Sequence, residues 1–172
     1  GVIMSGISIK SAQEIAYMKE AGRILSIVHD ELEKFIQPGI STWDIDKKGY
    51  DLIKSFGCEP SFLNYNGYPA SICVSVDDEV VHGFPSNKPL KEGQLLSVDC
   101  GLILDGWQSD SAFSAPVGKA DEETLRLIRV TEECFWLAAN MAREGNRLGD
   151  VSHAVQEHAE KHGYGGIREM CG

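Results

Sequence analysis

The chain has 172 residues, of which 42% are hydrophobic and 8% aromatic, a composition typical of one globular domain. Its 26 acidic residues outnumber its 16 basic residues, and the formal net charge is −10. This negative charge argues against DNA or an anionic membrane as a partner, because both require a basic surface, whereas it suits divalent cations. No apolar run has the length of a membrane span and no secretory signal opens the chain, so a cytoplasmic protein is expected.

The five cysteines are scattered, and no two of them form a C-x-x-C pair. An odd number without close spacing predicts free thiols in a reducing compartment rather than disulfides or a structural zinc site. Residues 1–3 precede Met4 and can be a cloning remnant, so they are left out of the fold prediction.

Two amphipathic helices are predicted in the first part of the chain. Ser11 and Glu14 form a capping-box pattern, and apolar residues then recur at steps of three and four until the Pro-Gly pair at 38–39 ends the helix. The apolar face expected for this helix consists of Ile15, Met18, Gly22, Leu25, Val28, Leu32 and Phe35. A second helix is capped by one of the hydroxyl residues at 41–42 and stopped by Gly57.

β-Structure follows, first in an aromatic stretch with an Asn-Gly turn at 66–67 and then in a hairpin over residues 95–117. The Asp-Gly pair at 105–106 lies between two apolar runs, and it is a strong hairpin signal because both central turn positions need a positive φ. With a two-residue loop, the numbers of each cross-strand pair add up to 211. Asp99 and Asp110 then lie on the same face as diagonal neighbours, roughly 6 to 8 Å apart.

Two carboxylates on one face repel each other unless water reaches both or a cation lies between them. One interpretation is that Asp99 and Asp110 are merely solvated. The other is a pair of divalent metal ions, which lie about 3.5 to 4 Å apart in two-metal hydrolytic sites. The spacing alone leaves both interpretations open.

Two further helices are predicted after Gly118. The apolar face of the first consists of Leu125, Ile128, Thr131, Phe135, Ala138 and Met141, with Gly145 near its end. Asp150 can cap the second helix, which Gly163 stops. A shift of 106 residues carries Gly39 onto Gly145, Asp44 onto Asp150 and Gly57 onto Gly163. A helix end, a helix start and a second helix end therefore coincide, which suggests an internal repeat.

The repeat defines the expected organisation of the chain. An N-terminal tail spans residues 1–10, a first repeat spans 11–118, and the helical part of a second repeat spans 119–172. Residues 167–172 would form the first strand of the second repeat. Counterparts of the hairpin aspartates would fall 106 residues further on, after the last residue of this sequence, so the second repeat is expected to be incomplete.

Three stretches resemble the type I methionine aminopeptidases, the bacterial branch of the pita-bread (creatinase/aminopeptidase) fold. They are YNGYPASICVSVDDEVVHGFP at 65–85, LKEGQLLSVDCGLILDGWQSDSAFSAPVG at 90–118 and GIREMCG at 166–172. The likeness extends from about Ser8 to Gly172. It implies an α+β pita-bread fold with a pseudo-twofold repeat, of which the first repeat is complete and the second incomplete.

The resemblance also implies a site. The family binds two divalent metal ions through five ligands, and Asp99 and Asp110 match its two aspartates. The histidine and two glutamate ligands correspond to positions after Gly172, so this chain is expected to lack three of the five and to be inactive without them. His82 matches the catalytic histidine that contacts the substrate near the scissile amide. The positions that match the pocket for the methionine side chain are Phe62, Tyr65, Tyr68 and Cys73.

The activity implied by the resemblance is removal of the N-terminal methionine from nascent proteins, with two divalent ions of Co, Mn, Fe, Zn or Ni as cofactors. Expected partners are the N-terminal Met peptides of nascent chains and the ribosome, and an intact relative is expected to be a monomer. Two alternatives stay open: a prolidase or proline-directed aminopeptidase of the same fold, and a non-catalytic pita-bread binding module. The pocket sequence YNGYP at 65–69 argues against a proline-directed enzyme. The presence of Asp99, Asp110 and His82 together argues against a non-catalytic module.

Two other features are assigned no catalytic role. His158 and His162 lie one helical turn apart, but Glu does not directly follow the first histidine as in zinc proteases, so no metal is assigned to them. Cys100 follows Asp99 and is expected on the opposite, buried face of its strand.

Overall fold

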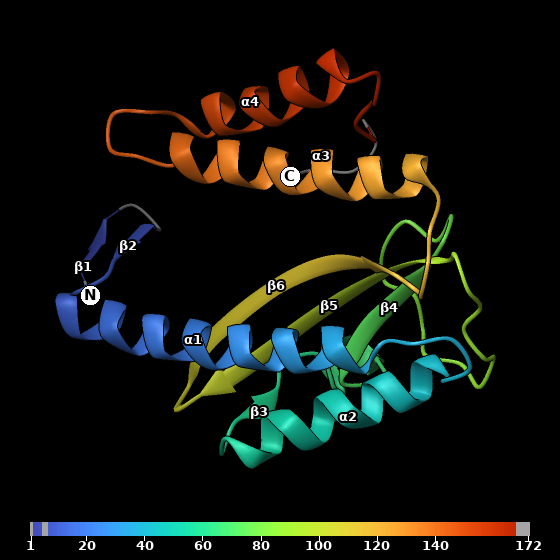
Figure 1. Ribbon diagram of the computed structural model, residues 1–172. Helices are drawn as coiled ribbons and strands as arrows, with labels where there is room; N and C mark the ends of the chain where they lie inside the picture. Colours follow the sequence, from blue (N-terminus) through green and yellow to red (C-terminus); the bar gives the residue numbers. More distant parts are fainter. Residues whose placement is uncertain (1, 5–6, 168–172) are drawn as a thin grey trace. The chain divides into compact units, whose positions relative to one another are not determined.

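Figure 1 shows the computed structural model, which describes residues 2–4 and 7–167. The chain divides into two compact units, Gly1–Ala120 and Asp121–Gly172. Residues 168–172, which hold Cys171 and most of the strand expected at 167–172, lie outside the described residues. Ile167 itself belongs to no strand.

The described elements follow each other in a simple order. The first unit contains β1 (Val2–Met4), β2 (Ile7–Ile9), α1 (Ala12–Phe35), α2 (Thr42–Ser55), β3 (Glu59–Pro60), the 3-10 turn η1 (Tyr65–Gly67), β4 (Ile72–Val76), β5 (Leu95–Leu104) and β6 (Trp107–Pro116). The second unit contains α3 (Glu122–Met141) and α4 (Leu148–Lys161). This mixture of helices and antiparallel strands agrees with the predicted α+β class.

The β5–β6 hairpin is the centre of a four-stranded antiparallel sheet. β6 pairs with one side of β5, and β4 and β3 pair with its other side. The predicted hairpin register is confirmed, with Leu104 opposite Trp107 at the turn. Asp105 and Gly106 have φ values of 49° and 85°, as a two-residue hairpin turn of this kind requires.

Both helices of the first unit begin with reciprocal capping. At α1, Ser11 Oγ accepts a hydrogen bond from the Glu14 N–H at 3.2 Å, and Glu14 Oε2 accepts one from the Ser11 N–H at 2.7 Å. At α2 the same exchange joins Ser41 and Asp44, at 3.1 and 2.7 Å, so the N-cap is Ser41 rather than Thr42. These bonds satisfy N–H groups that a helix start leaves without an intrahelical partner.

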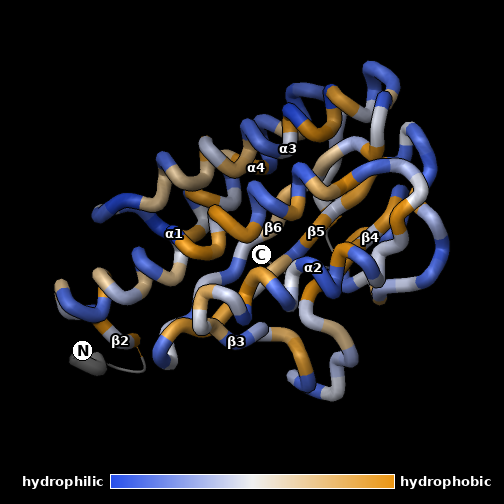
Figure 2. The backbone as a smooth tube through the Cα atoms, turned by 60° about the horizontal axis from the view of Figure 1, so that its bottom comes forward, coloured by the Kyte–Doolittle hydropathy of each residue, from blue (hydrophilic) through white to orange (hydrophobic). Residues whose placement is uncertain are grey.

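The core of the first unit lies between the sheet and its two helices. α1 packs against β5 and β6, and α2 packs against β3 and β4 (Figure 1). Figure 2 shows the apolar residues along β4 and β5 that complete this core. The largest fully buried side chains include Leu25, Leu32, Ile45, Ile53, Ile72, Leu96 and Leu102.

The first turns of α1 differ from the prediction. Ile15 and Met18, expected on the buried face, are 42% and 41% exposed. Tyr17 stacks on Trp107 with ring centroids 6.1 Å apart, and Trp107 directly follows the hairpin turn. The start of α1 therefore extends past the end of the sheet (Figure 1), so the periodic pattern continues where the strands no longer cover it.

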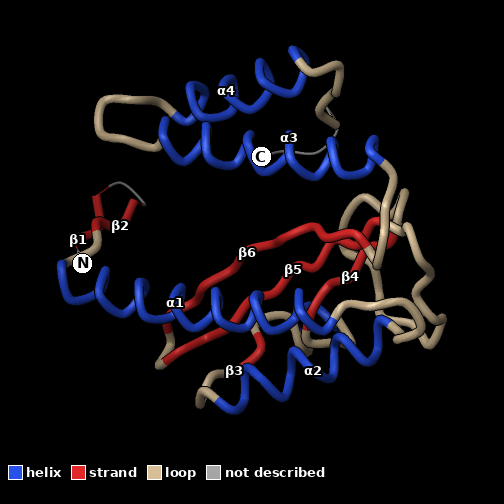
Figure 3. The backbone as a smooth tube through the Cα atoms, in the orientation of Figure 1, coloured by secondary structure: helices blue, strands red, loops and turns tan. Residues whose placement is uncertain are grey.

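The second unit is a pair of helices joined by a loop (Figure 3). Asp121 caps α3, and its Oδ1 accepts a hydrogen bond from the Thr124 N–H at 2.8 Å. The cap predicted for α4 is wrong by one turn: the N-cap is Arg147, and Asp150 lies inside the helix, where its Oδ2 accepts the Arg147 N–H at 2.7 Å.

The buried side of α3 also differs from the prediction. Phe135 is 60% exposed, whereas Val130 and Cys134 are only 3% and 6% exposed. The reason is the position of α4, because Cys134 Sγ lies 3.6 Å from the Val155 carbonyl oxygen. None of the described helices combines the length and hydropathy needed to cross a lipid bilayer.

Candidate active site

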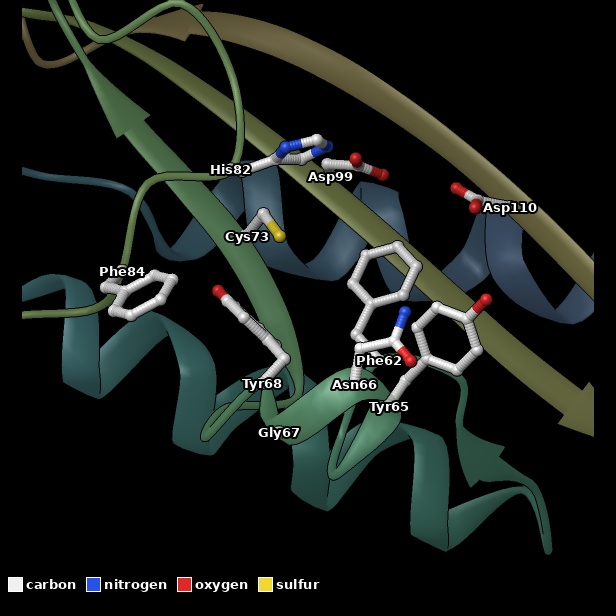
Figure 4. A pocket seen from close by; sticks show the side chains of 10 residues that line it. All are labelled: Phe62, Tyr65, Asn66, Gly67, Tyr68, Cys73, His82, Phe84, Asp99 and Asp110. Atoms are coloured by element: carbon white, nitrogen blue, oxygen red, sulfur yellow. The ribbon is translucent and has the colours of Figure 1, made fainter.

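Asp99 and Asp110 project from the face of the sheet opposite to α1 (Figure 4). Asp99 of β5 pairs with Ala112, and Asp110 of β6 pairs with Gly101, so the two side chains are diagonal neighbours on one face. Asp99 is partly buried and Asp110 is exposed. Cys100 points to the other face, where it is 0% exposed and part of the core, as predicted.

The carboxyl group of Asp110 opposes the ionisation of Asp99. Burial, followed by the negative charge of Asp110 and a hydrogen bond with it, raises the pKa of Asp99 to about 6, while the charge of His82 acts in the opposite direction. A divalent cation between the carboxyl groups would remove this repulsion. Carboxylate oxygens are ligands for the divalent ions of hydrolytic sites, so the pair fits part of such a site. Catalytic zinc sites usually take three protein ligands, and two aspartates are one fewer.

His82 lies in the loop between β4 and β5, beside Asp99 (Figure 4). Its φ of 58° is in the left-handed region, which is uncommon for a residue with a Cβ. The loop is held against β4 on both sides of Gly83: the Val74 N–H donates to the Gly83 oxygen at 3.1 Å, and the Gly83 N–H donates to Ser75 Oγ at 3.1 Å. The strand therefore fixes the backbone that carries the histidine.

Gly83 makes this close contact possible. A Cβ added at position 83 would lie 2.1 Å from the Val74 carbonyl oxygen, a separation that no side chain tolerates. Only glycine therefore allows the loop to approach β4 so closely. The left-handed backbone of His82 lies directly before this contact in the chain.

An open cavity of about 440 Å³ extends from the aspartates along the aromatic stretch that follows β3. It is lined by Phe62, Tyr65, Asn66, Gly67, Tyr68, Cys73, His82, Phe84, Asp99 and Asp110 (Figure 4). The aromatic rings lie on one side of the cavity, and the carboxyl groups lie on the other. This volume and this mixture of apolar walls with a few polar groups are typical of small-ligand sites.

The tyrosine at the centre of the aromatic wall is fixed by backbone contacts. The Tyr68 hydroxyl lies 2.7 Å from the Ile72 carbonyl oxygen and 3.2 Å from that of Gly83, and donates to them. Phe84 meets the Tyr68 ring edge to face, with centroids 5.2 Å apart. Burial raises the pKa of Tyr68 and of Cys73, so both side chains remain neutral at physiological pH.

Phe62 reaches the aspartates because residue 101 is a glycine. A Cβ added to Gly101 would lie 2.9 Å from Phe62 Cε1 and 3.0 Å from Ser61 Cβ. Gly101 is also the residue opposite Asp110 in the hairpin. The aromatic wall and the carboxylate pair therefore meet at this position.

The structure brings all seven residues singled out from the sequence to one cavity. These are Phe62, Tyr65, Tyr68, Cys73, His82, Asp99 and Asp110. Asn66 and Gly67 were expected only to form a turn, and Phe84 was not considered. A signal for Phe84 existed in the sequence, because it is an aromatic residue two positions after His82 in the same loop.

Comparison with known proteins agrees with this geometry. The model of metallopeptidase family M24 matches residues 16–172. A methionine aminopeptidase of Clostridium acetobutylicum is 46% identical over 167 residues, which are 96% of this chain and 67% of the relative. The crystal structure of methionine aminopeptidase from Rickettsia prowazekii matches with a TM-score of 0.93 and 34% identity, over 95% of this chain and 66% of that chain. An Xaa-Pro dipeptidase from Bacillus anthracis, with a TM-score of 0.80 and 22% identity over 91% of this chain and 43% of that chain, shares the fold.

The sheet with its paired carboxylates is thus that of a metal-dependent hydrolase, and the chain belongs to metallopeptidase family M24. Its relatives at 34% to 46% identity named above are methionine aminopeptidases. The expected resemblance and the α+β pita-bread fold are confirmed. The chain spans about two thirds of the length of the relatives it matches.

Proposed function

We propose that this chain provides the substrate pocket and part of the metal site for removal of the N-terminal methionine from proteins. The observation that carries the proposal is that Asp99, Asp110 and His82 open into the same aromatic cavity. The methionine aminopeptidase relatives, which cover this part of the chain at 34% to 46% identity, support the choice of methionine.

The carboxylates and the histidine have separate roles in this proposal. Asp99 and Asp110 would hold divalent cations, which when bound supply Lewis-acid activation of the peptide carbonyl and of the attacking water. His82 lies beside Asp99 at the edge of the cavity, where a neutral imidazole can donate a hydrogen bond to the scissile amide and orient it.

The aromatic wall suits a thioether side chain. Phe62, Tyr65 and Tyr68 present rings to the cavity, and Cys73 adds a neutral sulfur. A methionine sulfur against the edge of an aromatic ring gains about 0.3 to 1.5 kcal/mol. Because the tyrosine and cysteine stay neutral, the pocket favours an uncharged side chain over Lys or Glu.

The finer parts of the proposal concern the surroundings of the reaction. The cofactors would be two divalent ions of Co, Mn, Fe, Zn or Ni, and the substrates would be nascent chains at the ribosome. The protein would act in the cytoplasm, and an intact relative would be a monomer. The four described cysteines are free and buried, in agreement with a reducing compartment.

A chimaera tests the proposal. Residues 1–172 are joined to the C-terminal third of the Clostridium acetobutylicum relative, and the purified chimaera is incubated with Met-Ala-Ser and Mn²⁺ or Co²⁺. We expect release of free methionine, measured by chromatography. His82→Ala should lower kcat by about 100-fold, the usual effect of losing a group that orients or protonates the reacting atoms. Asp99→Asn should reduce turnover to background, because a metal ligand is lost.

Asp78→Asn is a matched control, since Asp78 is exposed and does not line the cavity. Hydrolysis of Ala-Pro but not Met-Ala-Ser would assign the chain to the proline-directed enzymes. Metal and peptide binding without hydrolysis would favour the non-catalytic module. The 172-residue polypeptide alone should show no turnover, because the two aspartates are fewer than the three protein ligands that a catalytic zinc site usually has.

A further inference from the structure

A second group of potential metal ligands lies between the helices of the second unit. Glu133 of α3 meets His158 of α4 and His162, the residue that directly follows α4 as its C-cap. One ligand atom of each residue lies within 4.8 Å of those of the other two. Figures 1 and 3 show the two helices side by side. The sequence offered only the two histidines, and the helix packing adds the carboxylate.

His162 is held in the way that metal-bound histidines usually are. Its Nδ1 lies 2.9 Å from the His158 carbonyl oxygen, which can only accept a hydrogen bond, so Nδ1 carries the proton. In the neutral imidazole the Nε2 lone pair is then free. Donation of the other ring N–H to a backbone carbonyl is a common means of orienting a histidine for metal binding.

Glu133 and His158 are already in contact. His158 Nε2 lies 2.7 Å from Glu133 Oε2, and the two imidazole rings have centroids 4.3 Å apart. The hydrogen bond from His158, and the nearby charges, lower the pKa of Glu133, so its carboxylate is ionised. The side chains of His158 and Glu133 are 19% and 43% exposed, so the group is open to ions from solvent.

We propose that Glu133, His158 and His162 bind one zinc ion that joins α3 to α4, separately from the aspartates of the first unit. Two imidazole nitrogens and one carboxylate oxygen are a usual zinc donor set, with water as the fourth ligand. Ligand atoms of a tetrahedral zinc ion lie roughly 3.3 Å apart, so His158 and Glu133 need to separate by less than 1 Å from their present contact. The proton on His158 Nε2 has to move to Nδ1 or leave.

One neighbouring charge opposes cation binding. Arg129 Nε lies 3.9 Å from Glu133 Oε1, the carboxylate oxygen that does not contact His158. A guanidinium so close to the ligand lowers the affinity for a divalent ion through charge repulsion. Replacing Arg129 should therefore raise the affinity for the ion, whereas a loss of structure would lower it.

The experiment uses the 172-residue polypeptide with Asp99→Asn and Asp110→Asn, which removes the other candidate site. Zn²⁺ is titrated in competition with a chromophoric chelator, and Co²⁺ serves as a spectroscopic probe. We expect one equivalent of Zn²⁺, visible bands of four-coordinate Co²⁺, and a higher melting temperature with Zn²⁺. His162→Asn should weaken Zn²⁺ binding about tenfold or more, and should remove the Co²⁺ bands.

The variants are matched to the structure. The amide of Asn can still donate to the His158 carbonyl oxygen, so His162→Asn removes the free nitrogen and keeps the contact. His153→Asn makes the same change at an exposed position of α4 and should leave the affinity unchanged. Arg129→Gln should raise the affinity about two- to fivefold, since a repelling charge is removed.

Three results would overturn the proposal. They are binding of less than one equivalent of Zn²⁺, equal affinity of the His162→Asn and His153→Asn proteins, and an unchanged or weaker affinity in Arg129→Gln. Circular dichroism and thermal melting without metal show whether each variant is folded. The gain expected from Arg129→Gln keeps the test decisive even if His162→Asn does not fold.

Discussion

Asp99 is the residue whose chemistry depends most on what occupies the site. Its carboxyl group is partly buried and lies next to a second carboxyl group, that of Asp110. Both effects favour the protonated form, and the pKa is raised from 3.8 to about 6. In the metal-free protein the residue is therefore a source of instability at neutral pH, which a cation would reverse.

This has a measurable pH dependence. Because the folded-state pKa is raised, the stability contributed by protonated Asp99 is fully present below about pH 4 and is lost as the pH rises through about 6. In EDTA, the free energy of unfolding of the parent should fall between pH 4 and pH 7. The fall should be smaller in Asp99→Asn by about 1 to 2 kcal/mol, after allowance for solvent screening. Urea unfolding at a series of pH values measures the difference.

Asp78→Asn should follow the parent curve, since Asp78 lies outside the cavity. Addition of Mn²⁺ should flatten the curve of the parent and leave that of Asp99→Asn nearly unchanged. Parallel curves for the parent and Asp99→Asn over this pH range would show that ionisation of Asp99 does not destabilise the folded protein.

At the scale of elements, one buried carboxylate joins the second helix to the strand that carries the pocket cysteine. Asp46 of α2 is 7% exposed, and its Oδ1 accepts hydrogen bonds from the Ser71 N–H at 2.7 Å and the Ile72 N–H at 3.0 Å. These donors lie at the start of β4, directly before Cys73. The helix therefore fixes where the strand begins.

Asp46→Ala should destabilise the chain by about 1 to 3 kcal/mol, because two buried N–H groups lose their acceptor. Asp46→Asn keeps an acceptor oxygen and should cost clearly less. Asp51→Ala, at an exposed position of the same helix, provides the matched comparison. Thermal melting ranks the three proteins, and a loss as large in Asp51→Ala as in Asp46→Ala would exclude the proposed anchoring.

Local signals account for the elements that could be predicted from the sequence. The hairpin register follows from Asp105 and Gly106, and the start of α1 follows from Ser11, because both depend on residues a few positions apart. The N-cap Arg147 was missed because arginine is not a usual capping residue. The partner of His158 was missed because Glu133 approaches it only through packing of two helices.

The site likewise combines features that the sequence predicts with features that depend on tertiary contacts. Resemblance and strand alternation identified the aspartates and the aromatic wall, but not the left-handed backbone of His82 or the contact of Gly83 with β4. Those features depend on a loop meeting a strand, which no periodicity encodes. Exposure of Ile15 was likewise unpredictable, because it depends on where the sheet ends.

At the scale of the whole molecule, the second helix of each helix pair has the same length, 14 residues. α2 spans Thr42–Ser55 and α4 spans Leu148–Lys161, so a shift of 106 residues carries both ends of one helix onto the other. Asp44 and Asp150 also correspond, and each accepts the N–H of its helix's N-cap residue at 2.7 Å. This supports an internal repeat, while its boundary after residue 118 stays a prediction.

The correspondence predicts similar effects in the two units. Asp44→Ala and Asp150→Ala should each lower stability by about 0.5 to 1.5 kcal/mol, because each removes the hydrogen bond from the N-cap N–H. Asp44→Ala also removes the bond from the Ser41 hydroxyl, so its loss should lie toward the upper end of this range. Hydrogen exchange resolved along the chain should place the loss in the first unit for Asp44→Ala and in the second unit for Asp150→Ala. A loss confined to one of the two variants would argue that the helix starts are not equivalent.

The alternating hairpin also limits how this part of the protein can evolve. Asp99 and Cys100 point to opposite faces, so inserting or deleting one codon between Asp99 and the turn would move the carboxylate into the core and the thiol into the cavity. Point substitutions leave the alternation intact. We therefore expect the interval of eleven positions between Asp99 and Asp110 to keep its length in descendants of this gene, even where the residues within it change.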